Sequence, residues 1–213
     1  MGCIELASPE VRRLAERDWR LAQLMARIGD LRYGESDSAF AQLTHSVIEQ
    51  MLSMKAGNTI NARLTDLCDG RVTPEGVRAL SLDQIRSCGM ARRKAETILS
   101  LAGAWTEDSL QALAQLSDDE VRAALCRTKG IGRWTADMFL IFHLGRPDVL
   151  PLEDGAVRQA FLWLYGVPIT DPAAQALVCD LWHPNASIPV RYLYRALNQG
   201  LVAAGPAAEV LGL

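Results

Sequence analysis

The sequence predicts an all-α fold, and three observations lead to this class. Apolar residues recur at intervals of three and four in most segments, which places them on one face of a helix. Patterns that start helices, such as Ser-Pro-Glu and Asp-Pro, precede many of these segments. A strand would show apolar and polar residues in alternation, and no stretch of useful length does so.

The expected helices follow one another along the whole chain. At Ser8-Pro9 a serine cap precedes a proline at the first helical position. Ser81 and Ser117 each begin a capping box, since Gln or Glu follows three residues later. Residues 31–38 are expected to form a polar loop. We expect helices over 9–28, 40–52 and 55–68, from Thr73 and Ser81, over 91–102, from Ser117 and about Arg133, over 155–165, from Asp171, and through Tyr192 to Leu197.

Composition bounds the classes of function. With 213 residues, 49% of them hydrophobic, the chain can form one domain or two lobes that share a cleft. The longest apolar run, residues 138–142, is far too short to cross a bilayer. We find no signal peptide and therefore expect a cytoplasmic protein, associated with the nucleoid if the source is bacterial. The five cysteines and three histidines are widely scattered, so no side-chain metal site is expected.

The segment from Leu125 to Ala136 is predicted to be a helix, a glycine hairpin and a second helix. Gly130 and Gly132 bracket Ile131, where the backbone has to turn sharply and a Cβ atom would clash. The free amides that begin the second helix, aided by Lys129 and Arg133, would bind an anion such as a DNA phosphate. The net charge of −3 argues mildly against DNA, but basic residues cluster at this turn. The alternative is an ordinary helical corner without a ligand.

Two strings carry a resemblance to a known family. They are Gly130-Ile131-Gly132-Arg133-Trp134-Thr135-Ala136 and Asp148-Val149-Leu150-Pro151-Leu152-Glu153-Asp154. They closely resemble the helix-hairpin-helix (HhH-GPD) DNA glycosylase superfamily, and more narrowly its alkyl-purine branch, the 3-methyladenine DNA glycosylase II type. The resemblance extends roughly from Arg27 to Trp182.

This resemblance implies a single glycosylase domain, residues 1–213, with two helical lobes that flank a cleft. Lobe one would cover about 37–143, including the hairpin 125–136, and lobe two about 1–36 plus 144–213. Family members often begin with a β-rich lobe, for which this sequence leaves no room, so we expect that lobe to be missing.

Asp154 matches the catalytic aspartate of the family, as the acid that directly precedes Gly-Ala-Val-Arg. Helix amides at a cap position stabilise an ionised carboxylate. Beneath a deoxyribose C1′ atom, that carboxylate could stabilise the oxocarbenium-like charge of glycosidic cleavage and orient the attacking water. The alternative is a helix N-cap without a catalytic role.

Bifunctional members of the family carry a lysine nucleophile just after the hairpin, where this chain has Trp134. Tryptophan cannot form a Schiff base, so a monofunctional enzyme that leaves an abasic site is expected. The chain also lacks the tightly spaced four-cysteine cluster with which some relatives bind an iron–sulfur centre.

Trp134 and Trp182 match two aromatic residues that line the base pocket in the alkyl-purine branch. Their rings would stack on a cationic alkylated purine, although a tryptophan is more often part of a core. Met138 would line the same pocket, at a position where the family commonly has tyrosine. Residues 185–189 also depart from the family pattern.

Further contacts with double-stranded DNA are expected from a turn that resembles the family's Gln-x-x-Ser motif. It contains Gln50, Met51 and Ser53. Met51 would enter the base stack where the damaged base leaves, unless it packs in the core. On the hairpin, the expected DNA contacts are Lys129, Gly130, Gly132, Arg133 and Thr135. No cofactor is expected, apart from a monovalent cation that the resemblance allows at the hairpin carbonyls.

The sequence therefore predicts a monomeric DNA glycosylase that flips alkylated purines out of duplex DNA and hydrolyses their glycosidic bonds in base excision repair. Since 3-methyladenine and 7-methylguanine carry positive charge, they should leave without a general acid. Hypoxanthine carries no such charge and leaves poorly unless a group protonates or hydrogen-bonds the departing ring. His183 is the only candidate for that role, so hypoxanthine should leave slowly. The alternatives are an adenine-mismatch or oxidised-base glycosylase, and a non-catalytic protein that binds damaged DNA.

Overall fold

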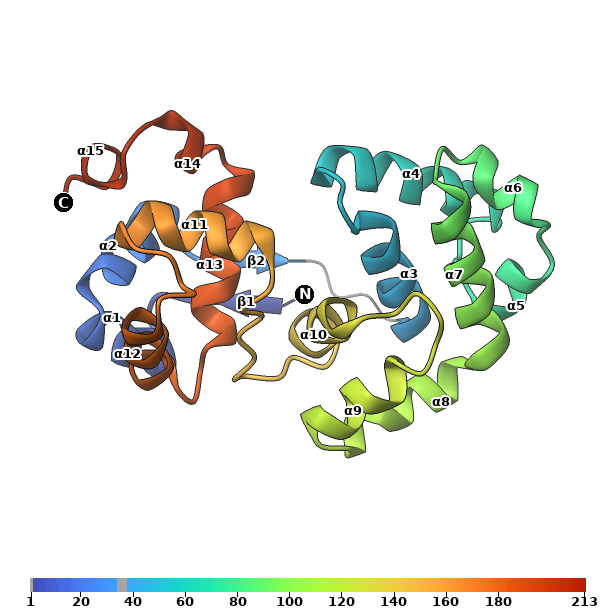
Figure 1. Ribbon diagram of the computed structural model, residues 1–213, viewed down its shortest axis with the longest axis horizontal. Coiled ribbons are helices and arrows are strands. Elements are labelled where there is room, and N and C mark those ends of the chain that lie inside the picture. The colour runs from blue at the N-terminus through green and yellow to red at the C-terminus, as the bar shows by residue number, and fades with distance from the viewer. Residues whose placement is uncertain (1, 34–37) are drawn as a thin grey trace. The chain divides into compact units, whose positions relative to one another are not determined.

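The computed structural model describes residues 2–33 and 38–213 of the chain. It divides into two compact units, one formed by Met1–Glu35 with Arg146–Leu213 (unit 1) and the other by Ser36–Gly145 (unit 2). Helices make up nearly all the regular structure (Figure 1), and the predicted all-α class is confirmed.

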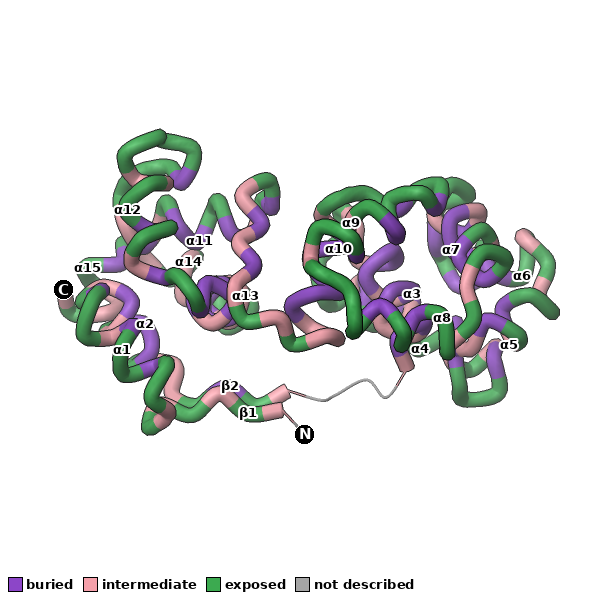
Figure 2. The backbone as a smooth tube through the Cα atoms, turned by 90° about the horizontal axis from the view of Figure 1, so that it is seen from below, coloured by how far each residue is buried: buried purple, intermediate pink, exposed green. Residues whose placement is uncertain are grey.

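Unit 2 is built around one buried helix, α3 (Ala39–Glu49), whose Phe40, Leu43 and Val47 are fully enclosed. Along the helices around it, buried and exposed residues alternate, so that each helix has a buried and an exposed face (Figure 2). They are α4 (Met54–Leu67), α5 (Pro74–Arg78), α6 (Leu82–Ser87), α7 (Arg92–Ala104), α8 (Glu107–Gln111), the 3-10 helix η1 (Ala112–Gln115), α9 (Asp118–Leu125) and α10 (Arg133–Phe142). Of these, α4, α7, α8 and α10 pack on α3. The capping boxes predicted at Ser81 and Ser117 are confirmed.

Unit 1 is centred on α13 (Ser187–Asn198), which packs on α2 and α11. Apolar side chains from three helices, among them Leu24, Phe161 and Leu193, are almost fully buried between them. The other elements of this unit are β1 (Gly2–Ile4), α1 (Pro9–Arg17), α2 (Trp19–Ile28), β2 (Leu31–Tyr33), α11 (Gly155–Tyr165), α12 (Pro172–Trp182), α14 (Leu201–Ala204) and α15 (Ala207–Leu211).

The helix expected over residues 9–28 is wrong in one respect, because it is two helices that meet at Asp18. This residue leaves the helical region with φ −134° and ψ 94° and caps α2 by accepting a hydrogen bond from the Leu21 amide. Its second carboxylate oxygen accepts hydrogen bonds from Tyr165 and Trp182. These tertiary partners of a buried carboxylate outweigh the local helical pattern.

The loop expected over 31–38 is wrong at its start, since β2 pairs with β1 in an antiparallel two-stranded sheet. The rest of that expected loop, residues 34–37, lies outside the described residues. Each strand has only three residues, too few for an alternating pattern to be recognised in the sequence. Within 2–33 and 38–213, no helix is long and apolar enough to cross a membrane.

Candidate active site and hairpin

The helix-hairpin-helix of unit 2 consists of α9, the turn 126–132 and α10. Gly130 has φ +90°, which a residue with a side chain rarely adopts. A Cβ atom there would also lie 1.9 Å from the Oγ1 atom of Thr97 on α7. The hairpin therefore packs so closely on α7 that only glycine fits at this position.

Gly132 is different, and the steric reason expected for it is wrong. Its φ of −106° and ψ of 177° are open to any residue, and an added Cβ would meet no atom within 4 Å. It is exposed and occupies the N-cap position of α10 without a side-chain cap. No side chain at this position caps the first amides of α10, as an anion site requires.

An ion pair between the two helices holds the hairpin's shape. Arg122 of α9 donates from Nε to the Oδ1 atom of Asp137 on α10, at 2.7 Å. The Asp137 side chain is only 3% exposed, and burial raises its pKa against the opposing effect of Arg122. Loss of one partner would leave the other charge buried without compensation.

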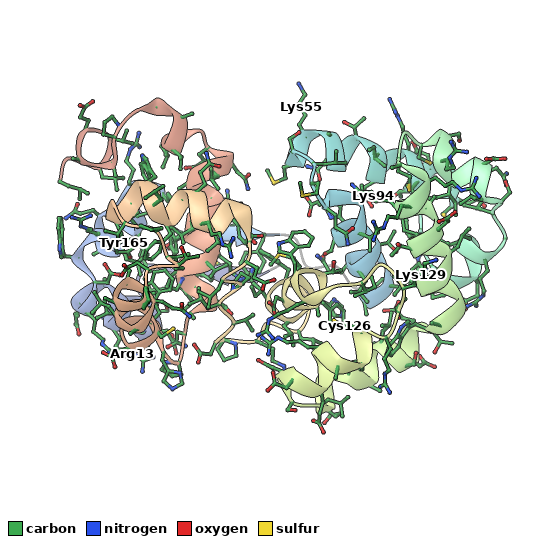
Figure 3. All side chains as sticks on the ribbon, in the orientation of Figure 1. Arg13, Lys55, Lys94, Cys126, Lys129 and Tyr165 are labelled. Atoms are coloured by element: carbon green, nitrogen blue, oxygen red, sulfur yellow. The ribbon has the colours of Figure 1, made fainter. Side chains whose placement is uncertain are left out.

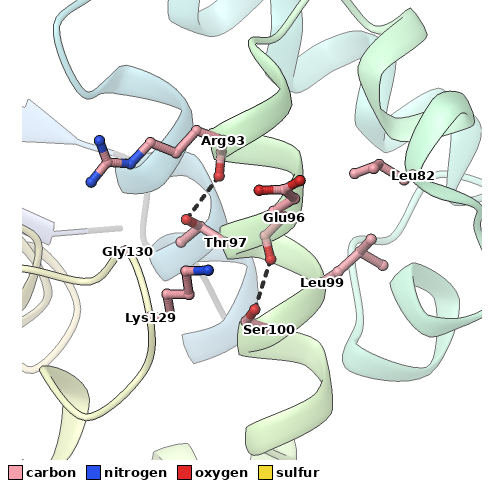
Figure 4. Close-up of a pocket in the computed structure, with 8 residues that line it drawn as sticks. All are labelled: Leu82, Arg93, Glu96, Thr97, Leu99, Ser100, Lys129 and Gly130. Atoms are coloured by element: carbon pink, nitrogen blue, oxygen red, sulfur yellow. Dashed lines mark hydrogen bonds between the residues drawn. The ribbon is translucent and has the colours of Figure 1, made fainter.

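The charged residues predicted to face DNA are exposed. The Arg133 side chain is 64% exposed and lies 3.8 Å from Asp137. Lys129 is also exposed and borders a hollow of about 390 Å³ between α7 and the hairpin (Figure 4). Arg93 and Glu96 of α7 line the same hollow. Both predicted cations are thus available to an anion at the hairpin.

Gln50 connects the turn after α3 with the hairpin. Its Nε2 atom donates to the Gly130 carbonyl at 3.3 Å and to the Thr135 hydroxyl at 3.0 Å. Thr135 is 1% exposed, so we correct its expected role from DNA contact to support of Gln50. The structure thus brings Gln50 to Gly130 and Thr135, which lie about eighty positions later in the sequence.

Met51 lies at the tip of that turn and is fully exposed, at 101% of its reference area. This excludes the alternative that it packs in the core. Its φ of +57° is rare for a residue with a side chain and directs an apolar group into solvent. Leu52 and Met54 are exposed beside it, while the Ser53 hydroxyl accepts a hydrogen bond from Ala56 as the cap of α4. Because of that bond, Ser53 has a structural role.

The predicted pocket residues of α10 differ in exposure. Trp134 is half-buried in the first turn of the helix. Met138, one turn later on the same face, is 5% exposed. Trp134 can therefore offer part of its ring to a ligand, with Met138 mostly enclosed behind it.

In unit 1, Asp154 is the N-cap of α11 and is 4% exposed. Its Oδ1 atom accepts a hydrogen bond from the Val157 amide at 2.7 Å. Its Oδ2 atom accepts one from the Tyr194 hydroxyl of α13 at 2.8 Å. Both donors stabilise the anion and fix its orientation. No sequence pattern pointed to Tyr194, which lies forty residues away along the chain.

Trp182 lies in the core of unit 1, with no exposed surface. Its Nε1 atom donates to Asp18 at 3.0 Å, and its ring lies edge-on to Phe161. The Tyr165 hydroxyl donates to the same carboxylate at 2.6 Å. Burial, together with the Asp18 charge, holds the pKa of Tyr165 well above its usual value. We therefore correct the pocket role of Trp182 to packing around Asp18.

His183 follows Trp182 at the end of α12 and is 71% exposed. Its Nδ1 atom lies 2.6 Å from the Oδ2 atom of Asp148. The Oδ1 atom of Asp148 accepts a hydrogen bond from the Ala186 amide. That His183 donates a proton to a leaving base stays a prediction.

Among the described side chains, no three His, Cys, Asp or Glu residues converge as metal ligands. Carbonyl oxygens of the turn accept hydrogen bonds within the protein, that of Thr128 from the Ile131 amide, that of Gly130 from Gln50 and that of Gly132 from the Ala136 amide. The cation expected at the hairpin carbonyls remains a prediction.

Comparison with known proteins gives matches over most of the chain. A family model described as the HhH-GPD superfamily of base excision DNA repair proteins matches residues 44–184. DNA-3-methyladenine glycosylase 1 of Schizosaccharomyces pombe is 32% identical over 159 residues, which cover 72% of this chain and 70% of that protein. DNA-3-methyladenine glycosylase 2 of Escherichia coli is 25% identical over 184 residues, covering 82% and 63%.

Solved structures agree with these matches. The crystal structure of a DNA-3-methyladenine glycosidase from Bacillus halodurans has a TM-score of 0.74 and 30% identity, covering 97% of this chain and 96% of that one. An S. pombe 3-methyladenine DNA glycosylase in complex with abasic DNA has a TM-score of 0.79 and 28% identity, covering 90% and 97%. The family expected from the hairpin and Asp154 is confirmed, and this chain belongs to the HhH-GPD superfamily of base excision DNA repair proteins.

Proposed function

We propose that this protein is a monofunctional DNA glycosylase that hydrolyses the N-glycosidic bond of alkylated purines in duplex DNA. The observation that carries the proposal is the setting of Asp154, a buried carboxylate held by two donors at a helix N-terminus. The relatives named as 3-methyladenine DNA glycosylases support the substrate class.

Asp154 would act on the sugar. As the bond from C1′ to the base breaks, the base takes the bonding electrons and C1′ gains positive charge. A carboxylate held beneath C1′ stabilises that charge without having to reorient, since two hydrogen bonds already fix it. It can then accept a proton from the water that attacks C1′, and the product is an abasic site.

Trp134 would act on the base. A purine methylated at N3 or N7 is cationic, and the face of an indole ring attracts a cation through its quadrupole. Such a base departs neutral, so its release requires the carboxylate and the stacking surface but no general acid. The half-buried position of Trp134 supports this role, and Met138 lies one turn behind it.

Met51 and the hairpin would act on the duplex. An exposed apolar side chain at the tip of a tight turn suits insertion into the gap that a flipped base leaves. The accessible amides of α10, with Lys129 and Arg133, suit a backbone phosphate. Such contacts position the protein without reading the sequence of the DNA.

The direct test is to incubate the protein with methylated duplex DNA and to identify the released bases by chromatography. We expect 3-methyladenine and 7-methylguanine, with hypoxanthine released slowly from a separate duplex. Binding without release would instead indicate a non-catalytic damage-binding protein. Release restricted to mismatched adenine or oxidised bases would indicate the other glycosylase class.

A further inference from the structure

Lys94 occupies an unusual position in unit 2. It lies in the first turn of α7, where the helix dipole disfavours a cation. Its side chain is partly buried, and desolvation lowers its pKa. Neither the local stability of α7 nor solvation of the ammonium explains this placement. The explanation therefore has to come from the tertiary partners of Lys94.

Those partners are backbone carbonyls at the end of α3. Figure 3 labels Lys94 among the side chains of unit 2. The Nζ atom donates to the Ile48 carbonyl at 2.7 Å and to the Gln50 carbonyl at 2.6 Å. The first belongs to the last turn of the helix, where carbonyls lack helical partners and a cation is favourable. The second belongs to the residue directly before Met51.

The turn is thus held from two sides. Lys94 binds its backbone, and the side chain of Gln50 binds the hairpin at Gly130 and Thr135. Between these attachments Met51 has a positive φ. This backbone conformation is unfavourable in free energy for any residue other than glycine, so it persists only where the surrounding structure enforces it. The ammonium supplies two charge-assisted hydrogen bonds for that purpose.

We propose that Lys94 is a positioning residue that holds the Met51 turn in the conformation needed to extrude a base. The inference rests on the proposed function of Met51 as the inserted side chain. Lys94 itself touches neither DNA nor substrate in this account. It acts through the backbone of Gln50.

Three variants test the proposal. Lys94→Met keeps the aliphatic stem and removes the ammonium, while Lys94→Arg retains donors for both carbonyls. The matched control is Arg78→Met, because Arg78 also donates to a last-turn carbonyl within unit 2, that of Ala102 at 2.5 Å, but at the end of α7.

The readout compares two substrates under single-turnover conditions. One duplex has 7-methylguanine paired with cytosine, and the other has the same lesion opposite an abasic-site analogue. An unpaired base requires less work to extrude. Lys94→Met should therefore slow the paired lesion roughly ten-fold more than the unpaired one, because both charge-assisted hydrogen bonds to the turn are lost. Lys94→Arg should restore most of the rate, and Arg78→Met should leave the ratio unchanged.

Two further measurements separate this mechanism from a general loss of stability. If Lys94 acts through Met51, the double variant with Met51→Ala should be no slower than Met51→Ala alone. Amide hydrogen exchange of residues 49–54 in the free protein should be faster in Lys94→Met and unchanged in Arg78→Met.

Equal slowing on both substrates, or unchanged exchange at the turn, would overturn the proposal. If the wild-type protein released no alkylated base, the proposed function would fail instead. The exchange measurement would still show whether Lys94 holds the turn.

Discussion

Substitution of the two hairpin glycines by alanine should affect different properties, the free energy of unfolding at Gly130 and DNA binding at Gly132. At Gly130, alanine would have to adopt φ +90°, which costs an L-residue about 1–2 kcal/mol. Its Cβ would also lie 1.9 Å from Thr97 Oγ1 and 2.8 Å from Cγ2, and such overpacking costs about 1–3 kcal/mol. We therefore expect Gly130→Ala to lose about 2–5 kcal/mol, out of a total stability of about 5–15 kcal/mol.

Gly132→Ala should leave the free energy of unfolding within about 0.5 kcal/mol of the wild type, because the site is open and its backbone is unstrained. If a DNA phosphate approaches the α10 amides at that point, the added methyl group should still weaken duplex binding. A change in binding without a change in stability would thus locate the DNA backbone at the hairpin.

Urea unfolding and duplex affinity at a fixed salt concentration measure both effects. Thr97→Ala removes the two nearest of the three clashing atoms and leaves the Cβ atom of residue 97 at 2.9 Å. It should therefore return part of the stability lost in Gly130→Ala, but not the part due to φ. Wild-type stability of Gly130→Ala would refute the close packing of the hairpin on α7. Unchanged affinity of Gly132→Ala would refute DNA approach at the α10 amides.

Three other predictions concern chemistry and pH. Tyr194→Phe removes a hydroxyl that donates to Asp154. Single-turnover cleavage should therefore slow roughly ten-fold, with little change in DNA affinity. An unchanged rate would show that Tyr194 does not orient the carboxylate. The resemblance to the family aligns Trp134 with the lysine of bifunctional members, and tryptophan cannot form a Schiff base. Borohydride should therefore trap no covalent adduct, and product DNA should stay unnicked until alkali is added; a trapped adduct would contradict this. Burial raises the pKa of Tyr192 to about 12, above the value of about 10 for an exposed tyrosine. The folded state therefore retains the Tyr192 proton to higher pH than the unfolded state does. The stabilisation from this group is fully present below about pH 10, and the free energy of unfolding should decrease between about pH 10 and 12 by about 1.4 kcal/mol per pH unit. Tyr192→Phe should show a weaker decrease over the same pH range.

Local sequence patterns predicted those parts of the molecule that local chemistry determines. Ser81 and Ser117 carry their capping boxes, and Asp154 begins a helix with the bounds expected, because each signal lies within a few residues of the structure it specifies. The same holds for Gly130. These features could be predicted from the sequence.

The features that the sequence did not reveal depend on distant partners. Asp18 interrupts a continuous apolar stripe because Tyr165 and Trp182, about 150 residues away, donate to its carboxylate. Tyr194 reaches Asp154, and Lys94 reaches the end of α3, only once the helices are packed. The pattern of one helix contains no information about such contacts.

Asp154 is proposed to carry the chemistry, and one substitution tests this most directly. Asp154→Asn keeps the size of the side chain and an oxygen that can accept a hydrogen bond, but removes the negative charge. We would measure single-turnover release of 7-methylguanine from a defined duplex, together with affinity for a duplex that contains an abasic analogue. We expect release to fall by at least roughly a hundred-fold, the usual scale for loss of a group that stabilises transition-state charge, while affinity stays nearly unchanged. Release within a few-fold of the wild-type rate would contradict it.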